Sequence, residues 1–218
     1  MAATGTQTDE HTGAAALARR VPPQMLFALG AVSQYVGSAV AVLIFEVVPA
    51  AGVAWLRVAA AAGALALWRK PWRNERWNRR SLAIVVAFGV TIALMNLTFY
   101  LAIDHIPLGT AVAIEFIGPI TVAAIGSRTR RDAAALALAT LGVVLLADIH
   151  FAGSPEGVAL ALGAGVFWAL YVVIGHRVAA DPALRPQDGL AAGMIIGAVV
   201  VAASMLRSHE ADEPTEAV

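Results

Sequence analysis

The sequence contains no cysteine and only one lysine. Without cysteine, the chain of 218 residues cannot form disulfides, iron–sulfur clusters or thiolate metal sites. Lys70 lies between two apolar segments, which excludes a retinal Schiff base inside a seven-helix bundle. The five histidines fall in tails and loops, and the sequence has neither a Walker-type glycine loop nor a Gly-x-Ser-x-Gly nucleophile. We therefore predict no cofactor, no metal, no nucleic-acid partner and no enzymatic activity.

Charged residues are also scarce. They make up 14% of the chain, whereas hydrophobic residues make up 59% and the mean hydropathy is +0.74. A soluble domain carries about 25% charged residues. The composition therefore predicts an all-α membrane protein in contact with a lipid bilayer.

Seven apolar segments are long enough, or nearly so, to cross about 30 Å of hydrocarbon as helices. They are residues 24–45, 50–68, 81–102, 107–126, 133–148, 156–175 and 188–206, of which the fifth is the shortest. We predict seven transmembrane helices between a disordered cytoplasmic tail, residues 1–23, and an acidic tail, residues 207–218.

Basic residues are unevenly distributed between the loops that would join these spans. If the spans alternate in direction, thirteen of the fifteen lie on one side: Arg19, Arg20, Arg69, Lys70, Arg73, Arg76, Arg79, Arg80, Arg128, Arg130, Arg131, Arg177 and Arg185. By the positive-inside rule, the N-terminus is cytoplasmic and the C-terminus is outside. The arginine-rich and alanine-rich usage suits a bacterial genome, so we predict a bacterial cytoplasmic (inner) membrane protein.

The fourth apolar segment carries an acid, Glu115. A carboxylate in hydrocarbon costs roughly 2.5 to 3.5 kcal/mol on insertion scales, so it usually faces a bundle interior or a wet cavity. Pro119, four residues later, has no amide hydrogen for the Glu115 carbonyl, and Gly118 removes side-chain bulk. We predict a broken or kinked helix, with Glu115 and Pro119 both at a functional site. The alternative is that Glu115 only pairs with a neighbouring helix.

Further polar residues lie at a comparable depth on other segments. Arg57 is the only basic residue inside a span, and Glu115 is the one deep acid available to it. Their pairing is either static or part of a clamp for a substrate carboxylate. Asn96 and Tyr100 lie in the outer half of the third segment. Polar groups at one depth on adjoining helices predict one shared site.

Four more residues complete the predicted translocation site. Gln34 and Ser38 lie near the middle of the first segment, and Trp168 and Tyr171 lie in the sixth. Taken alone, each is more often a contact between helices than a ligand contact.

Small residues four apart let helix backbones approach closely in a membrane. Such ladders include Ala161, Gly165 and Ala169 in the sixth segment and a glycine series in the seventh. The latter consists of Gly189, Gly193 and Gly197. We expect packing seams within one bundle; the alternative for the glycine series is that it docks a further helix or a second copy in a homodimer.

Three stretches carry a resemblance to a known family. They are Met-Asn-Leu-Thr-Phe-Tyr at residues 95–100, Ile-Pro-Leu-Gly-Thr-Ala-Val-Ala-Ile-Glu-Phe-Ile-Gly-Pro at residues 106–119 and Ala-Leu-Gly-Ala-Gly-Val-Phe-Trp-Ala-Leu-Tyr at residues 161–171. The chain resembles the threonine/homoserine exporter group of EamA-type carriers in the drug/metabolite transporter superfamily. This resemblance implies two inverted five-helix repeats around a central cavity and export of small amino acids across the cytoplasmic membrane.

The chain departs from that family, which has ten spans. Residues 24–148 would form one complete five-helix repeat, and residues 156–206 would form two helices of an inverted second repeat. We therefore expect a C-terminally truncated member. The predicted function is a proton-coupled secondary transporter in which Glu115 exchanges a proton for the substrate ammonium, Arg57 holds the carboxylate and Tyr100, Trp168 and Tyr171 line the path. The alternative is a non-transporting membrane protein that acts only through helix–helix association.

Overall fold

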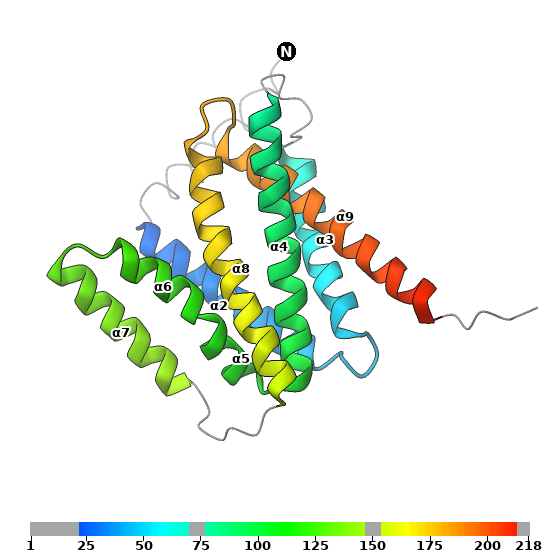
Figure 1. Ribbon diagram of the computed structural model, residues 1–218, viewed down its shortest axis with the longest axis horizontal. Coiled ribbons are helices and arrows are strands. Elements are labelled where there is room, and N and C mark those ends of the chain that lie inside the picture. Colours follow the sequence, from blue (N-terminus) through cyan, green and yellow to red (C-terminus); the bar gives the residue numbers. More distant parts are fainter. Residues whose placement is uncertain (1–21, 70–76, 147–153, 213–218) are drawn as a thin grey trace, which may run out of the picture. The chain divides into compact units, whose positions relative to one another are not determined.

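The computed structural model describes residues 22–69, 77–146 and 154–212, and every regular element in these ranges is a helix (Figure 1). The helices are α2 (Pro23–Val42), α3 (Ala50–Arg69), α4 (Arg79–His105), α5 (Leu108–Glu115), α6 (Ile117–Gly126), α7 (Arg130–Leu146), α8 (Pro155–Ala180) and α9 (Pro186–Asp212). The chain divides into two compact units, residues 1–44 and 45–218. The predicted all-helical fold is confirmed for the described residues.

The N-terminal unit contributes α2. Its apolar part, Ala28–Val42, is shorter than a membrane span. The predicted span over residues 24–45 extends too far, because the chain leaves the helix after Val42 and turns through residues 43–47 ahead of Pro49. The predicted tail lies almost wholly outside the described residues.

The second unit contains five helical stretches that are long and apolar enough to cross a membrane. They are Ala50–Trp68, Arg79–His105, Leu108–Gly126, Pro155–Ala180 and Pro186–Met205. They match five of the seven predicted spans. Helix α7 falls short, because its first turn carries Arg130, Arg131 and Asp132. The described part of its apolar stretch, residues 133–146, is about 21 Å long at the helical rise, against about 30 Å of hydrocarbon.

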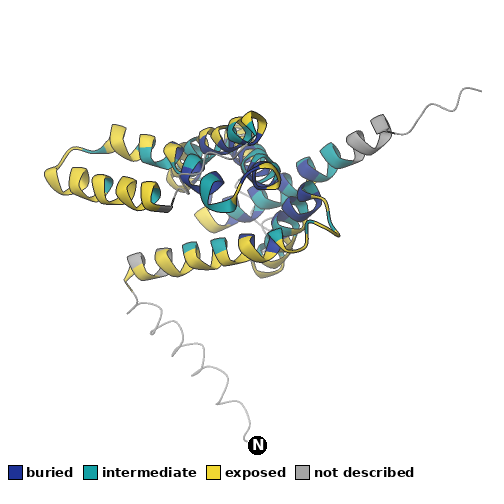
Figure 2. Ribbon diagram, turned by 90° about the horizontal axis from the view of Figure 1, so that it is seen from below, coloured by how far each residue is buried: buried dark blue, intermediate teal, exposed yellow. Residues whose placement is uncertain are grey.

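Helix α4 packs against α3, α8 and α9, and its apolar side chains form the centre of this unit. Phe88 and Ile92 of α4 cluster with Val58 of α3 and Val178 of α8. Figure 2 shows buried positions concentrated in these helices, whereas α7 is exposed along most of its length. The outer face is also apolar: Ile125 is 81% exposed and Leu145 is 77% exposed. Exposed aliphatic side chains are expected on apolar helices that face lipid.

The glycine series of α9 packs inside this unit. A Cβ atom on Gly193 would lie 2.8 Å from Cδ1 of Phe88, and one on Gly197 would lie 3.1 Å from the carbonyl oxygen of Gly89. Gly189 meets Val178 of α8 in the same way. Helices α4 and α8 therefore cover the glycine series, as expected for a packing seam within one bundle. The alternative of an external helix or a homodimer is not supported, because the glycine surface is already covered.

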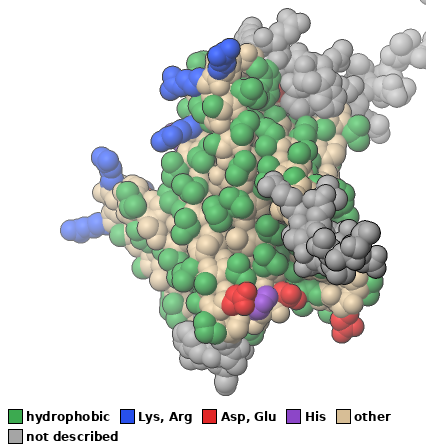
Figure 3. Space-filling view, turned by 45° about the vertical axis from the view of Figure 1, so that its right-hand side comes forward, with side chains coloured by type: hydrophobic (Ala, Val, Ile, Leu, Met, Phe, Trp, Pro, Cys, Tyr) green, Lys and Arg blue, Asp and Glu red, His purple; other side chains and the backbone are tan. Residues whose placement is uncertain are grey.

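Charged side chains separate toward opposite ends of the visible face. Figure 3 shows arginine side chains above and to the left, acidic and histidine side chains at the lower end, and hydrophobic side chains between them. His105 at the end of α4 lies 4.0 Å from Glu156 at the start of α8, measured between Nε2 and Oε2. This separation agrees with the predicted concentration of basic residues on one side of the membrane. The direction of the chain across the membrane remains a prediction.

Helices α4 and α8 are also joined at their other ends. The Asn78 side chain caps α4 by accepting a hydrogen bond of 2.8 Å from the Ser81 amide. The Ser81 hydroxyl, which is fully buried, donates to Oδ2 of Asp181 at 2.8 Å. The start of α4 is thereby held against the end of α8.

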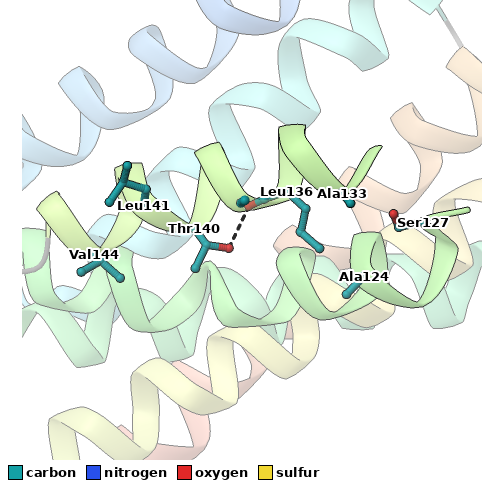
Figure 4. Close-up of a pocket in the computed structure, with 8 residues that line it drawn as sticks. Ala124, Ser127, Ala133, Leu136, Thr140, Leu141 and Val144 are labelled. Carbon is teal, nitrogen blue, oxygen red and sulfur yellow. Dashed lines mark hydrogen bonds between the residues drawn. The ribbon is translucent and has the colours of Figure 1, made fainter. Parts of the chain in front are cut away.

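We expect Ser81→Ala to lower the free energy of unfolding by about 1 to 3 kcal/mol, the usual range for a hydrogen bond to a carboxylate. The quantity to measure is the thermal midpoint of the detergent-solubilised chain. Thr140→Val is the control, because the Thr140 hydroxyl donates only to the Leu136 carbonyl of its own exposed helix, at 2.9 Å (Figure 4). Equal midpoints for wild type and Ser81→Ala would contradict this role for the bond.

Candidate functional site

The fourth predicted span is interrupted at Phe116, which separates α5 from α6. Phe116 keeps a helical backbone, with φ −63° and ψ −17°, and its carbonyl still accepts from the Ile120 amide at 3.0 Å. The interruption is therefore confined to one residue. Pro119 explains it, because proline has no amide hydrogen to donate to the Glu115 carbonyl. The predicted break in this helix is confirmed.

Two glycines bring α8 against this break. A Cβ atom on Gly118 would overlap the carbonyl oxygen of Gly165 and lie 2.6 Å from its carbonyl carbon. A Cβ atom on Gly165 would lie 2.9 Å from the carbonyl oxygen of Glu115. The backbones of α6 and α8 thus touch directly, and α8 covers the carbonyl that Pro119 leaves without a helical donor. Non-helical backbone at membrane depth is tolerated when protein buries it in this way.

The Glu115 side chain is buried, with the residue only 6% exposed. The positive charge of Arg57, on α3, acts on its carboxyl group. Burial disfavours the charged form of a carboxylic acid, whereas a nearby cation favours it. Glu115 is therefore an acid held in the interior of the helical unit.

Arg57 is tied to Tyr100 of α4. Its Nη1 donates a hydrogen bond of 2.9 Å to the Tyr100 hydroxyl, and its guanidinium carbon lies 5.9 Å from the centre of the tyrosine ring. Tyr100 is 1% exposed and its ring lies between Phe45 and Phe99, with centroid distances of 6.3 Å and 5.8 Å. The structure therefore joins two of the predicted site residues, Arg57 and Tyr100, while Glu115 is buried on α5.

Asn96 lies one turn before Tyr100 on α4. Its side-chain nitrogen donates to the Ile92 carbonyl of the same helix at 2.9 Å. The neighbouring Thr98 hydroxyl likewise donates to the Leu94 carbonyl at 2.7 Å. Both polar groups make their hydrogen bonds within α4. Asn96 lies four residues before Tyr100 and therefore shares a helix face with it.

The two aromatic residues of α8 separate. Trp168 packs edge-on against Phe116 at the helix break, with ring centroids 4.9 Å apart. Tyr171 instead stacks on Phe88, with centroids 5.2 Å apart, and packs against the central apolar cluster. Trp168 is therefore adjacent to the helix break. Tyr171 lies about one turn later on α8 and packs against α4 in the apolar core instead.

Gln34 and Ser38 belong to the N-terminal unit. There the Ser38 hydroxyl donates to the Gln34 carbonyl at 3.2 Å within α2. Their predicted part in the same site as Glu115 stays a prediction.

Sequence reasoning identified Gly165 only as part of a packing ladder and did not identify Phe116, Phe45 or Phe99. The small residues four apart on α8 were the available signal for Gly165. Nothing in the sequence pattern indicated that Phe45, outside any helix, would pack on Tyr100, because that contact depends on how the turn before α3 lies against α4.

An apolar groove of about 320 Å³ lies beside the crossing of α6 and α8. Ile117 and Thr121 line it from α6, and Val166 and Leu170 line it from α8. The Thr121 hydroxyl already donates to the Ile117 carbonyl at 2.7 Å. A second, open groove of about 680 Å³ between α6 and α7 is lined chiefly by alanine, leucine and valine (Figure 4). Both linings suit acyl chains rather than a charged solute.

These features define a class: multi-pass helical membrane proteins that keep an acid and an arginine in their interior. Ionisable groups at such depth mark substrate or ion pathways by default.

The comparisons with known proteins are specific. The chain is 38% identical over 167 residues to the threonine/homoserine exporter RhtA of Escherichia coli (strain K12), and 37% identical over 167 residues to the protein of the same name from Salmonella typhimurium (strain SL1344). Each match covers 75% of this chain and 55% of the relative, so the chain spans about half the length of these curated relatives. No family model and no solved structure matches the chain.

The chain is thus homologous to threonine/homoserine exporters over three quarters of its length. Together with the long apolar helices, this homology supports a multi-pass protein of the bacterial inner membrane.

Proposed function

We propose that this chain is an EamA-type carrier of the drug/metabolite transporter superfamily and exports small amino acids such as threonine or homoserine. The identity of 38% to an exporter of these amino acids is the observation that carries the proposal. The interior placement of Glu115, Arg57 and Tyr100 supports it, because a zwitterionic substrate needs one partner of each charge.

The proposed cycle is an exchange of a proton for the substrate. With the site open to the cytoplasm, the Glu115 carboxylate binds the substrate ammonium and the Arg57 guanidinium binds its carboxylate. With the site open to the outside, a proton binds Glu115, the ammonium loses its partner and the substrate leaves. Protonated Glu115 then returns and releases its proton to the cytoplasm. The site is neutral with Glu115 ionised, whether empty or holding the zwitterion, and carries one net positive charge while the proton is bound.

The topology that accompanies this proposal has seven spans, a cytoplasmic N-terminus and an external C-terminus. Residues 24–148 form one five-helix repeat and residues 156–206 form part of an inverted second one, as in many secondary transporters. The break at Phe116 supports this arrangement, because discontinuous helices at mid-membrane are common at transporter sites.

A second candidate function is a non-transporting membrane protein that acts through helix contacts. The observation that favours it is the direct backbone packing of α6 on α8 beside Glu115, at Gly118 and Gly165. On this proposal the Glu115 and Arg57 interaction only stabilises the bundle.

Resistance to toxic external homoserine tests the two against each other. We expect cells that express the chain to tolerate a several-fold higher concentration than cells with empty vector, because export lowers internal homoserine. Membrane abundance is measured by immunoblot in the same cultures. Unchanged tolerance with the chain present in the membrane would overturn the exporter and favour the second candidate.

A further inference from the structure

The Arg57 and Tyr100 pair differs from an ordinary interior salt bridge in the charge of the acceptor. The Tyr100 hydroxyl is neutral, and it accepts from Nη1 of Arg57 at 2.9 Å. A neutral acceptor orients a guanidinium without cancelling its charge, whereas a carboxylate acceptor would do both. The hydrogen bond to Tyr100 therefore orients the guanidinium and leaves its charge unchanged.

Burial separates the roles of the two residues. Tyr100 is 1% exposed, whereas Arg57 is partly exposed. Phe45 and Phe99 pack around the tyrosine ring, and Phe99 lies edge-on to it with an interplanar angle of 89°. Because the Tyr100 ring is held on two sides, its hydroxyl oxygen is fixed at one point.

The guanidinium is planar, so one hydrogen bond together with the ring 5.9 Å away restricts the orientation of the whole fork. Two-pronged binding of a carboxylate depends on that orientation. A lysine at this position would carry the same charge without the fork.

We propose that Tyr100 is a positioning residue: its hydroxyl orients the Arg57 guanidinium for the carboxylate of the substrate and does not itself contact the substrate. This inference rests on the proposed export function. It assigns the selectivity for substrates with a free carboxylate to the Arg57 and Tyr100 pair on α3 and α4.

The test compares efflux of homoserine by the full chain with Tyr100→Phe, which keeps the ring and removes only the hydroxyl. We expect the homoserine concentration for half-maximal efflux to rise about tenfold, the effect of one lost hydrogen bond, with little change in the maximal rate. Inhibition by 3-aminopropan-1-ol, which is homoserine without its carboxylate, should be unchanged. If Tyr100 had only a structural role, Tyr100→Phe would weaken homoserine efflux and inhibition by 3-aminopropan-1-ol equally.

Thr98→Val is the matched control, because it removes a hydroxyl two residues away whose hydrogen bonds go to its own helix. The double variant with Arg57→Lys should be no worse than Arg57→Lys alone, since Tyr100 acts through Arg57. If Tyr100→Phe fails to reach the membrane, Arg57→Lys takes its place, with the same selective loss of homoserine expected.

The outcomes are distinct. If wild type shows no homoserine efflux, the proposed function fails. If wild type exports homoserine and Tyr100→Phe matches it, or loses both compounds equally, the export function stands and the positioning role is overturned. If Arg57→Lys binds homoserine as tightly as the wild type does, the positioning role of Tyr100 is overturned as well.

Discussion

Alanine in place of Gly118 should largely prevent accumulation of the folded chain. The added Cβ atom would overlap the Gly165 carbonyl oxygen, and its other close neighbour, at 2.6 Å, is also backbone. Neither atom can rotate away as a side chain can, so α6 must move off α8. Overpacking costs about 1 to 3 kcal/mol even where side chains can adjust, and more where they cannot.

The measurement is membrane abundance together with the thermal midpoint in detergent. We expect a loss of most folded protein for Gly118→Ala and a similar, smaller loss for Gly165→Ala, whose Cβ atom would lie 2.9 Å from the Glu115 carbonyl oxygen. Gly163→Ala is the control on the same helix α8, since a Cβ atom there meets nothing within 4 Å. That variant should be neutral or slightly more stable, as alanine favours helix over glycine by about 1 kcal/mol. A wild-type midpoint for Gly118→Ala would show that these backbones do not touch.

Glutamine in place of Glu115 should abolish export while the protein still folds. The two side chains have nearly the same shape, but glutamine can neither release a proton nor pair with the substrate ammonium. We expect homoserine efflux to fall at least tenfold at equal membrane abundance. Glu156→Gln is the control, because Glu156 is 73% exposed at the start of α8 and should leave efflux unchanged.

The thermal midpoint of Glu115→Gln separates a working group from a structural one. If Glu115 served only to neutralise Arg57, removing it would leave an uncompensated interior cation and cost about 3 to 5 kcal/mol. On the proposed function the midpoint should stay near that of wild type, because Arg57 is partly exposed and its charge does not need Glu115 for stability. Full export activity at equal abundance would exclude Glu115 from the mechanism.

Much of the site could be predicted from the sequence because its signals are local. Glu115 stands out as an acid in an apolar segment, and Pro119 removes one amide hydrogen at a fixed spacing from it. Both features act within one turn of helix, and the structure confirms the break they predict. Glu115 is buried, as an acid in an apolar segment is expected to be.

The contacts of the predicted path-lining residues depend on which helix faces which. Tyr171 stacks on Phe88. Phe45 and Phe99 pack around the Tyr100 ring, and its hydroxyl binds Arg57. That these two residues line a path stays a prediction. A sequence gives the depth of a residue along its helix, whereas rotation about the helix axis is set by packing against neighbours.

By itself the sequence determined that this chain is helical and apolar, where most of its helices lie, and that one of them breaks beside an acid. Hydropathy and a missing amide hydrogen are properties of the chain alone. Only the tertiary structure decided that Gly165 covers the Glu115 carbonyl, that α4 fills the glycine seam of α9 and that Tyr100 holds Arg57. Those contacts join residues of different helices, and close packing selects among many pairings that the same apolar pattern allows.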